Sequence, residues 1–232
     1  MCMKQLNSVR IIGHRGAAGT VFENTTESIL AAIHAGVCCI EIDVWKTRDG
    51  ELILFHDAYL ERLTDQKGFI RDLDYKSIQN IRLRNNASIP TLKEIITIAK
   101  THDIKLLVEV KDENVVIDTY NLLNSEMSFK NFIIGSFFHK PICELKTLYP
   151  QVQTSIMLEA VPVGFEDYLK RVNPDYVTVS VQSYNDYLIN SVKKQGRKLI
   201  FYTINTESEM ERMIQIKPWA IVTDYPERFI KQ

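Results

Sequence analysis

The sequence predicts an α/β fold in which one domain, residues 1–232, forms a (β/α)8 barrel. Apolar runs of strand length alternate with amphipathic helical segments from end to end, and no low-complexity linker divides the chain. Several strands end in charged or histidine side chains, and the carboxyl ends of barrel strands are where active sites lie. One strand pair is joined too closely for a parallel crossover, which leaves eight strands for the barrel.

The composition fits one globular unit with a large core. Of the chain, 45% is hydrophobic and 25% is charged, which is ordinary for a folded domain. The 28 basic and 29 acidic residues nearly cancel, so there is no electrostatic footprint for nucleic acid or for an anionic membrane. The first ten residues lack the apolar core of a signal peptide, and no run of about 18 apolar residues occurs. We therefore expect a cytoplasmic protein without a nucleic-acid partner or a stable membrane anchor.

The predicted strands are nine runs rich in Val, Ile and Phe. Helix starts between them are marked by a cap residue three positions before a glutamate, as in a capping box. Gly36 and Gly196 stand where a left-handed residue would end a helix. The strands cover residues 9–13, 38–45, 52–55, 105–110, 131–136, 153–158, 175–180, 198–204 and 220–223. The cap pairs are Asn24 with Glu27, Thr91 with Glu94, and Thr206 with Glu209.

The second and third strands are predicted to form a β-hairpin. Only residues 46–51 separate them, and Asp49-Gly50 is a favourable hairpin turn. Folding back at this turn would bring Glu41 opposite His56, while the two-residue strand period places Asp43 on the face of Glu41. The stretch 57–90 that follows has no place in the alternation, so we expect a small insertion over or beside the barrel mouth, with a short helix near residues 75–84.

The four cysteines are predicted to be reduced thiols. They are Cys2, Cys38, Cys39 and Cys143, and no two of them have the C-x-x-C spacing. The adjacent pair cannot easily form a normal disulfide, so we expect it to pack at the start of the second strand.

Three carboxylates, Glu41, Asp43 and Glu109, end up together at the predicted barrel mouth. Clustered negative charges repel one another unless most are protonated or a cation binds among them. Oxygen ligands suit a hard ion better than zinc, so the sequence predicts one divalent cation, Mg²⁺ or Ca²⁺. Surface salt bridges could explain one such carboxylate, but they explain three at strand ends less well.

Arg15 and Lys111 complete an electrostatic match to a phosphodiester. With the three carboxylates they carry a net charge of minus one, a divalent cation raises it to plus one, and a phosphodiester monoanion returns it to zero. The guanidinium can bind two phosphate oxygens in a fork, and the ammonium adds a point charge. Both are therefore predicted phosphate contacts.

His14 and His56 are the predicted acid and base. One histidine at a strand end is usually structural, but two beside the same carboxylates favour proton transfer near neutral pH. The remaining histidines, His34, His102 and His139, fall in or beside helices and are expected at helix ends or on the surface. In the loop after the first strand, Glu23 is expected to bond Arg15 or His14.

At these residues the chain resembles the glycerophosphodiester phosphodiesterase family. The resemblance implies a TIM barrel of the phospholipase C-like type that hydrolyses glycerophosphodiesters to glycerol phosphate and an alcohol with a divalent metal. It implies the same acid and base pair, metal ligands and phosphate contacts, and it places Tyr202 on the alcohol or glycerol side of the pocket. The matching segments are HRGAAGTVFENT (14–25), EIDVWKTRDGELILFHD (41–57), IPTLKEI (89–95), VEVK (108–111), FYTIN (201–205) and IVTDYP (221–226).

Two other functions stay open at this point. A lysophospholipase D-type phosphodiesterase would use the same site for lysophospholipids, with Phe137, Phe138 and Tyr202 lining an apolar channel. A non-catalytic barrel would bind phosphodiesters without turnover, although all seven expected polar groups are present. The sequence does not distinguish direct attack by water from a cyclic phosphate intermediate, and it does not indicate the oligomeric state.

Overall fold

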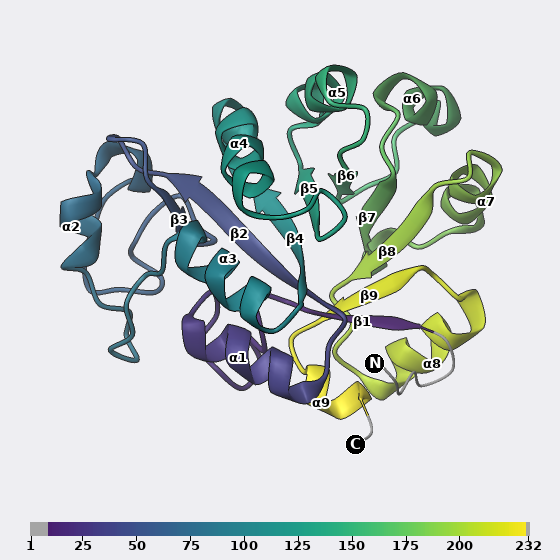
Figure 1. Ribbon diagram of the computed structural model, residues 1–232. Helices are drawn as coiled ribbons and strands as arrows, with labels where there is room; N and C mark the ends of the chain where they lie inside the picture. The colour runs from purple at the N-terminus through teal and green to yellow at the C-terminus, as the bar shows by residue number, and fades with distance from the viewer. Residues whose placement is uncertain (1–8, 231–232) are drawn as a thin grey trace.

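A computed structural model describes residues 9–230, which form a closed barrel of parallel strands (Figure 1). The hydrogen-bonded order is β1-β9-β8-β7-β6-β5-β4-β2, and pairing of β1 with β2 closes the ring. The extra strand β3 lies outside the ring, antiparallel to β2. The strands are β1 (Arg10–Gly13), β2 (Cys39–Lys46), β3 (Leu52–Leu54), β4 (Lys105–Val110), β5 (Phe132–Ser136), β6 (Thr154–Leu158), β7 (Tyr176–Ser180), β8 (Lys198–Tyr202) and β9 (Ala220–Thr223).

Helices surround this ring and connect one strand to the next (Figure 1). They are α1 (Thr26–Ala35), α2 (Tyr75–Gln79), α3 (Leu92–Thr101), α4 (Val116–Glu126), α5 (His139–Leu148), α6 (Phe165–Val172), α7 (Asp186–Lys194), α8 (Glu207–Ile216) and α9 (Pro226–Phe229). The described part of the chain also contains the short 3-10 helices η1 (Ile70–Asp72), η2 (Glu113–Val115) and η3 (Val181–Ser183). Within residues 9–230 none of the helices has the length and apolar character needed to cross a bilayer.

The predicted α/β barrel is confirmed, including the hairpin after the second strand. The hairpin register differs by one residue from the expected one, because Val44 pairs with Leu54 and Phe55 N donates to Asp43 O at 3.2 Å. His56 therefore lies one position away from a pairing with Glu41. The eighth strand ends at Tyr202, two residues earlier than predicted.

The capping boxes at Thr91 and Thr206 are present as predicted. The first helix is different, because Thr25 is its N-cap and accepts a hydrogen bond from Ser28 N. Asn24 instead has a left-handed backbone, with φ of 54°, and its side chain turns toward β2. Gly36 and Gly196 have positive φ, as expected of helix-terminating residues.

Two layers of apolar side chains hold the barrel together. One layer lies between the strands and the surrounding helices. The other fills the inside of the barrel and includes Ile12, Cys39, Leu107, Ile133, Met157, Tyr176 and Ile200. Cys39 and Cys143 are free thiols as predicted, Cys38 packs against the inner layer, and Cys2 lies outside the described residues.

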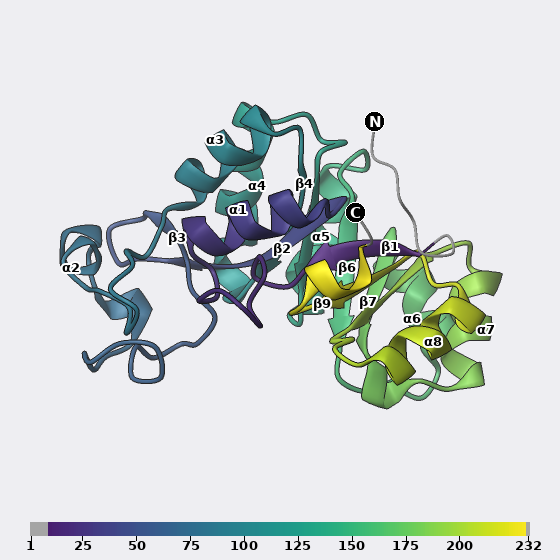
Figure 2. The ribbon, with the colours of Figure 1, turned by 90° about the horizontal axis from the view of Figure 1, so that it is seen from below.

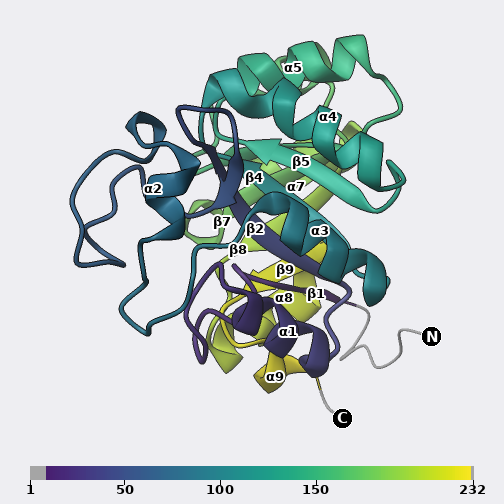
Figure 3. The ribbon, with the colours of Figure 1, turned by 60° about the vertical axis from the view of Figure 1, so that its left-hand side comes forward.

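The stretch 57–90, which contains α2, lies to one side of the ring of strands in all three views (Figures 1, 2 and 3). It has a hydrophobic cluster of its own, in which Leu60, Ile70 and Ile78 pack against Trp45 and Phe55 of the hairpin. Its helix α2 begins at Tyr75, as expected, but has only five residues. The carboxyl end of β2 points toward this segment (Figure 1).

Candidate active site

Three neighbouring strands and the hairpin deliver the seven predicted site residues to one place. His14 and Arg15 directly follow β1, and Lys111 directly follows β4. Asp43 of β2 and Glu109 of β4 are register partners, so their side chains leave adjacent strands on the same face. A cavity of about 150 Å³ is lined by six of the seven residues, His14, Arg15, Glu41, His56, Glu109 and Lys111. Asp43 lies beneath it and is fully buried.

The turn after β1 needs a glycine to present its two functional side chains. Gly16 has φ of 90°, and a Cβ there would lie 2.5 Å from the backbone oxygen of Ser28. Arg15 itself has φ of 47°. Its backbone N donates to Glu41 Oε2 at 3.0 Å, which joins the turn to β2.

Glu41, Asp43 and Glu109 form a buried carboxylate triad that could hold a metal ion. One oxygen from each lies within 4.8 Å of the others. Burial, Asp43 and Glu109 raise the pKa of Glu41 well above its ordinary value, and burial with Asp43 raises the pKa of Glu109 to about 7. Burial also acts to raise the pKa of Asp43, but Lys111 and Arg15 outweigh it and lower that pKa. Crowded oxygens of this kind suit a hard divalent cation.

Two cations lie against the triad. Lys111 Nζ is 3.1 Å from Asp43 Oδ1 and 2.5 Å from Glu109 Oε1, and Arg15 Nε is 3.0 Å from Asp43 Oδ2. Asp43 Oδ1 is buried and accepts no well-directed hydrogen bond. Asn24 Nδ2 donates to the other oxygen at 2.8 Å, so Asn24 positions the carboxylate instead of capping the first helix. The buried Asp43 carboxylate is therefore held by Asn24 and Arg15 on one oxygen and faces Lys111 with the other.

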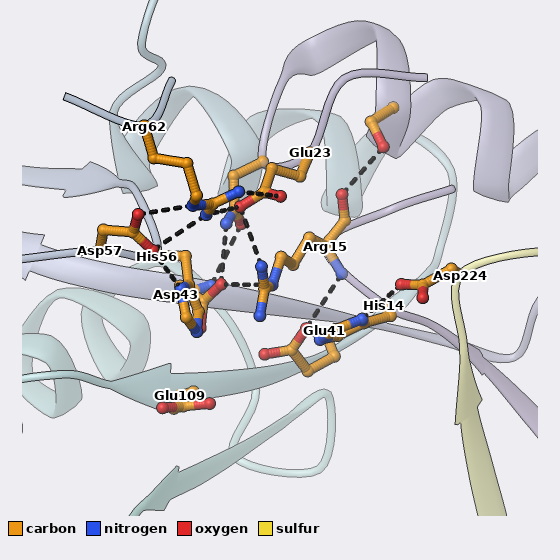
Figure 4. Close-up of polar contacts among 12 residues, drawn as sticks. His14, Arg15, Glu23, Glu41, Asp43, His56, Asp57, Arg62, Glu109 and Asp224 are labelled. Atoms are coloured by element: carbon orange, nitrogen blue, oxygen red, sulfur yellow. Dashed lines mark hydrogen bonds and ion pairs between the residues drawn. The ribbon is translucent and has the colours of Figure 1, made fainter. Parts of the chain in front are cut away.

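His14 is held by a carboxylate from the last strand end. Its Nδ1 lies 2.5 Å from Asp224 Oδ1, while its Nε2 faces Glu41 Oε2 at 3.9 Å (Figure 4). Asn205, which follows β8, donates from Nδ2 to Asp224 Oδ2 at 2.6 Å and accepts from Asp224 N at 3.0 Å. This chain of contacts fixes the orientation of the imidazole ring.

His56 is held by its own neighbour in sequence. Its Nδ1 lies 2.6 Å from Asp57 Oδ1, and Arg62 Nε donates to Asp57 Oδ2 at 2.5 Å. Arg62 also donates to both carboxylate oxygens of Glu23, at 3.0 and 2.7 Å, and Glu23 accepts from Arg15 Nη1 at 2.9 Å (Figure 4). Burial lowers the pKa of His56, and the Asp43 carboxylate only partly offsets this. The predicted bond from Glu23 to Arg15 is thus confirmed.

Sequence reasoning missed the supporting roles of Asp57, Arg62, Asn205 and Asp224. The sequence position of two of them is informative, because Asn205 and Asp224 lie just beyond strand ends, as the predicted site residues His14 and Lys111 do. Arg62 had none, since it belongs to the insertion. His139 begins α5, as expected of a helix-end residue, and its ring is half-buried. Its Nε2 contacts Met157 O at 2.7 Å, and its Nδ1 contacts the hydroxyl of Tyr168.

The opposite wall of the cavity has a different character. It is lined by Phe137, Met157, Glu159, Thr178, Tyr202, Thr203 and Val222, which come from β5 to β9 and the loops that follow them. Tyr202 therefore lines the pocket, as expected.

Comparisons with known proteins identify relatives along nearly the whole chain. Residues 14–228 match the sequence profile of the glycerophosphoryl diester phosphodiesterase family. A glycerophosphodiester phosphodiesterase of Caldanaerobacter subterraneus is 28% identical over 95% of this chain and 96% of its own. One of Bacillus subtilis is 26% identical over 95% of this chain and 85% of its own. An Oleispira antarctica phosphodiesterase, solved with its product sn-glycerol-3-phosphate, superposes with a TM-score of 0.88 at 25% identity, covering 95% of this chain and 94% of that one.

Proposed function

This chain belongs to the glycerophosphoryl diester phosphodiesterase family of phosphoric diester hydrolases, and from that premise we propose that it hydrolyses glycerophosphodiesters to glycerol phosphate and an alcohol with the help of a divalent cation. The observation that carries the proposal is the convergence of the buried carboxylate triad, two oriented histidines and two cations at one cavity. The glycerol phosphate bound to the Oleispira antarctica relative is the product that such a reaction would release.

Glu41, Asp43 and Glu109 are the proposed ligands of Mg²⁺ or Ca²⁺. Their donor atoms lie within 4.8 Å of one another, and Asp43 Oδ1, which is buried and ion-paired with Lys111, keeps lone-pair capacity for a metal. A divalent cation bound there would supply positive charge beside the phosphoryl oxygens.

Arg15 and Lys111 are the proposed contacts of the nonbridging phosphate oxygens. Arg15 enters the site already oriented by Glu23 and Asp43. Little reorganisation is then needed when charge develops on the phosphoryl group, which is how preorganised donors lower a barrier. Lys111 provides the second positive charge from the end of β4.

His14 and His56 are the proposed acid and base. Each ring has Nδ1 on a carboxylate, from Asp224 and Asp57 respectively, so Nε2 is the atom that exchanges the proton with substrate. One imidazole accepts the proton of the attacking hydroxyl, and the other donates one to the leaving alkoxide. Each role is worth roughly two to four orders of magnitude in rate.

The test is release of glycerol phosphate from glycerophosphocholine and glycerophosphoethanolamine by the purified protein, with Mg²⁺, with Ca²⁺ and with EDTA. Release with a metal and none with EDTA is expected. Hydrolysis of lysophospholipids but not of glycerophosphodiesters would identify a lysophospholipase D-type enzyme. Binding of the diesters without any turnover would identify a non-catalytic barrel.

A further inference from the structure

The cavity wall opposite the carboxylate triad combines one carboxylate with aromatic rings. Of the seven described residues on this wall, Glu159 is the single charged one, and Phe137 and Tyr202 are the aromatic ones. Tyr202 contacts Glu159, and Phe137 packs against Tyr202. Resting on the proposed hydrolysis, we propose that this wall is a subsite for a cationic alcohol, with Glu159 as the residue that makes the protein select diesters of cationic alcohols over diesters of uncharged ones.

Glu159 is placed firmly at the mouth. It directly follows β6, and the Tyr202 hydroxyl donates to its Oε1 at 2.8 Å and to Leu158 O at 3.0 Å. Its backbone oxygen accepts from the hydroxyl of Ser183. Within residues 9–230, Glu159 Oε2 has no hydrogen-bond or ion-pair partner. An oriented carboxylate at the cavity therefore retains one oxygen for a ligand.

The rings beside Glu159 are suited to an ammonium group. Phe137 and Tyr202 meet edge to face, with centroids 6.3 Å apart and planes at 88°. Phe137 is 39% exposed, so part of its ring remains open at the mouth. A cation near aromatic faces is attracted by the ring quadrupole, and the attraction is stronger where water is excluded. A carboxylate next to such rings is the combination expected for an alkylammonium group.

The charge distribution of the cavity orients a diester. Arg15 and Lys111 attract the phosphate to the wall formed by β1, β2 and β4. One substituent of the phosphate can then face the wall that carries Glu159, and in this proposal it is the alcohol. There, a cationic alcohol gains attraction, an uncharged alcohol gains none, and an anionic alcohol is repelled.

The test compares kcat/KM for glycerophosphocholine with kcat/KM for glycerophosphoglycerol, whose alcohol is uncharged, in wild type and in Glu159→Gln. Glutamine keeps an oxygen for the Tyr202 hydroxyl but removes the charge. We expect kcat/KM for glycerophosphocholine to fall about fivefold to tenfold, mainly through KM, because roughly 1 kcal/mol of attraction is lost. The kcat/KM of Glu159→Gln for glycerophosphoglycerol should stay within about twofold of the wild-type value, since an uncharged alcohol is not attracted by the charge that the substitution removes.

Two further variants make the result specific. Phe137→Leu keeps an apolar side chain but removes the ring, and should also lower kcat/KM for glycerophosphocholine alone. Glu211→Gln makes the same charge change on the exposed outer helix α8 and should leave both substrates unchanged.

Other outcomes would overturn the proposed subsite. An equal loss for both substrates would mean that Glu159 contacts the common glycerol group, and no loss for either would mean that it contacts no substrate; both overturn the subsite. Suppose that wild type hydrolyses both diesters and that the ratio of their kcat/KM values is the same in Glu159→Gln as in wild type. This result would overturn the subsite and leave the proposed hydrolysis intact. Failure of wild type to hydrolyse either diester with Mg²⁺ or Ca²⁺ would overturn both.

Discussion

Asp224 and His14 meet at 2.5 Å although 210 positions separate them in the chain. Their contact follows from barrel closure, since β9 is the parallel neighbour of β1 and the two strands end side by side, with Gly13 paired to Thr223. Burial would raise the pKa of Asp224, but the His14 hydrogen bond and charge outweigh it and lower that pKa. Asp224 thus remains an anion that orients the ring.

Replacing Asp224 by Asn should reduce kcat while leaving KM nearly unchanged. The amide is a weaker acceptor for Nδ1 and does not stabilise imidazolium, so we expect a loss of about tenfold to a hundredfold, less than that of a whole acid or base. Because Asp224 acts through His14, Asp224→Asn should cause little further loss of kcat in a His14→Ala background. Asp65→Asn, at a side chain that is 93% exposed, is the matched control and should leave the rate unchanged. A full further loss of rate in the His14→Ala background would assign Asp224 a merely structural role.

Replacing His14 or His56 by Ala should lower kcat at least about a hundredfold, because each removes one proton-transfer step. The carboxylate triad is left intact, so titration calorimetry should find Mg²⁺ or Ca²⁺ affinity close to that of wild type. If both variants retained near wild-type rates, the acid and base assignment would be wrong.

Replacing Glu41 by Gln should abolish activity and weaken binding of the cation. Glutamine preserves the side-chain volume and can still accept from Arg15 N, which lies 3.0 Å from the carboxylate, so the barrel should remain folded by circular dichroism. The expected readout is a loss of heat signal for Mg²⁺ and Ca²⁺, together with the same loss of turnover that EDTA causes in wild type. Full turnover by this variant in the presence of a chelator would refute the metal assignment.

Replacing Arg62 by Gln should lower the free energy of unfolding by about 1 kcal/mol at neutral pH, the upper end for partly exposed ion pairs. Burial acts to raise the pKa of Glu23 and of Asp57, but hydrogen bonds from Arg62 and other cationic or histidine neighbours outweigh it and lower both. Carboxylates with lowered folded-state pKa values stabilise the fold above their ordinary pKa of about 4 and lose this contribution as the pH falls through the folded-state values.

The difference between Arg62→Gln and wild type should therefore be largest above about pH 5 and shrink in acid, as followed by urea unfolding at several pH values. Arg84→Gln, in the same insertion but 4.0 Å from its exposed partner Asp65, should show a much smaller difference at every pH. A constant difference from neutral to acid pH would exclude the ion-pair explanation.

Local sequence patterns were sufficient for most of the fold. Strand runs such as residues 105–110 were found at their observed bounds, and the Asp49-Gly50 turn correctly identified the hairpin. Errors arose where tertiary contacts outweigh local preference. Asn24 has the chemistry of a helix cap, yet its amide is more useful to the buried carboxylate of Asp43, and Thr25 takes over the cap.

The site residues at strand ends could be predicted from the sequence. Their hydrogen-bond partners on distant segments of the chain could not. The strand period explains why Glu41 and Asp43 share a face, and parallel register explains why Glu109 joins them. Nothing local indicates that Arg62 of the insertion reaches Glu23, 39 positions earlier, or that Asp224 receives the ring of His14. These pairings depend on how the barrel closes and on where the insertion lies.

Barrel closure through β1 and β9 also sets when the site can exist during synthesis. The ribosome adds Asp224 210 residues after His14, and β2 to β9 are all made between the two. Until then β1 lacks one of its two neighbours, and the imidazole lacks its acceptor. A nascent chain that stalls before β9 therefore carries both histidines and the whole carboxylate triad, but not an oriented His14. Appearance of full activity would report that translation has passed the last strand.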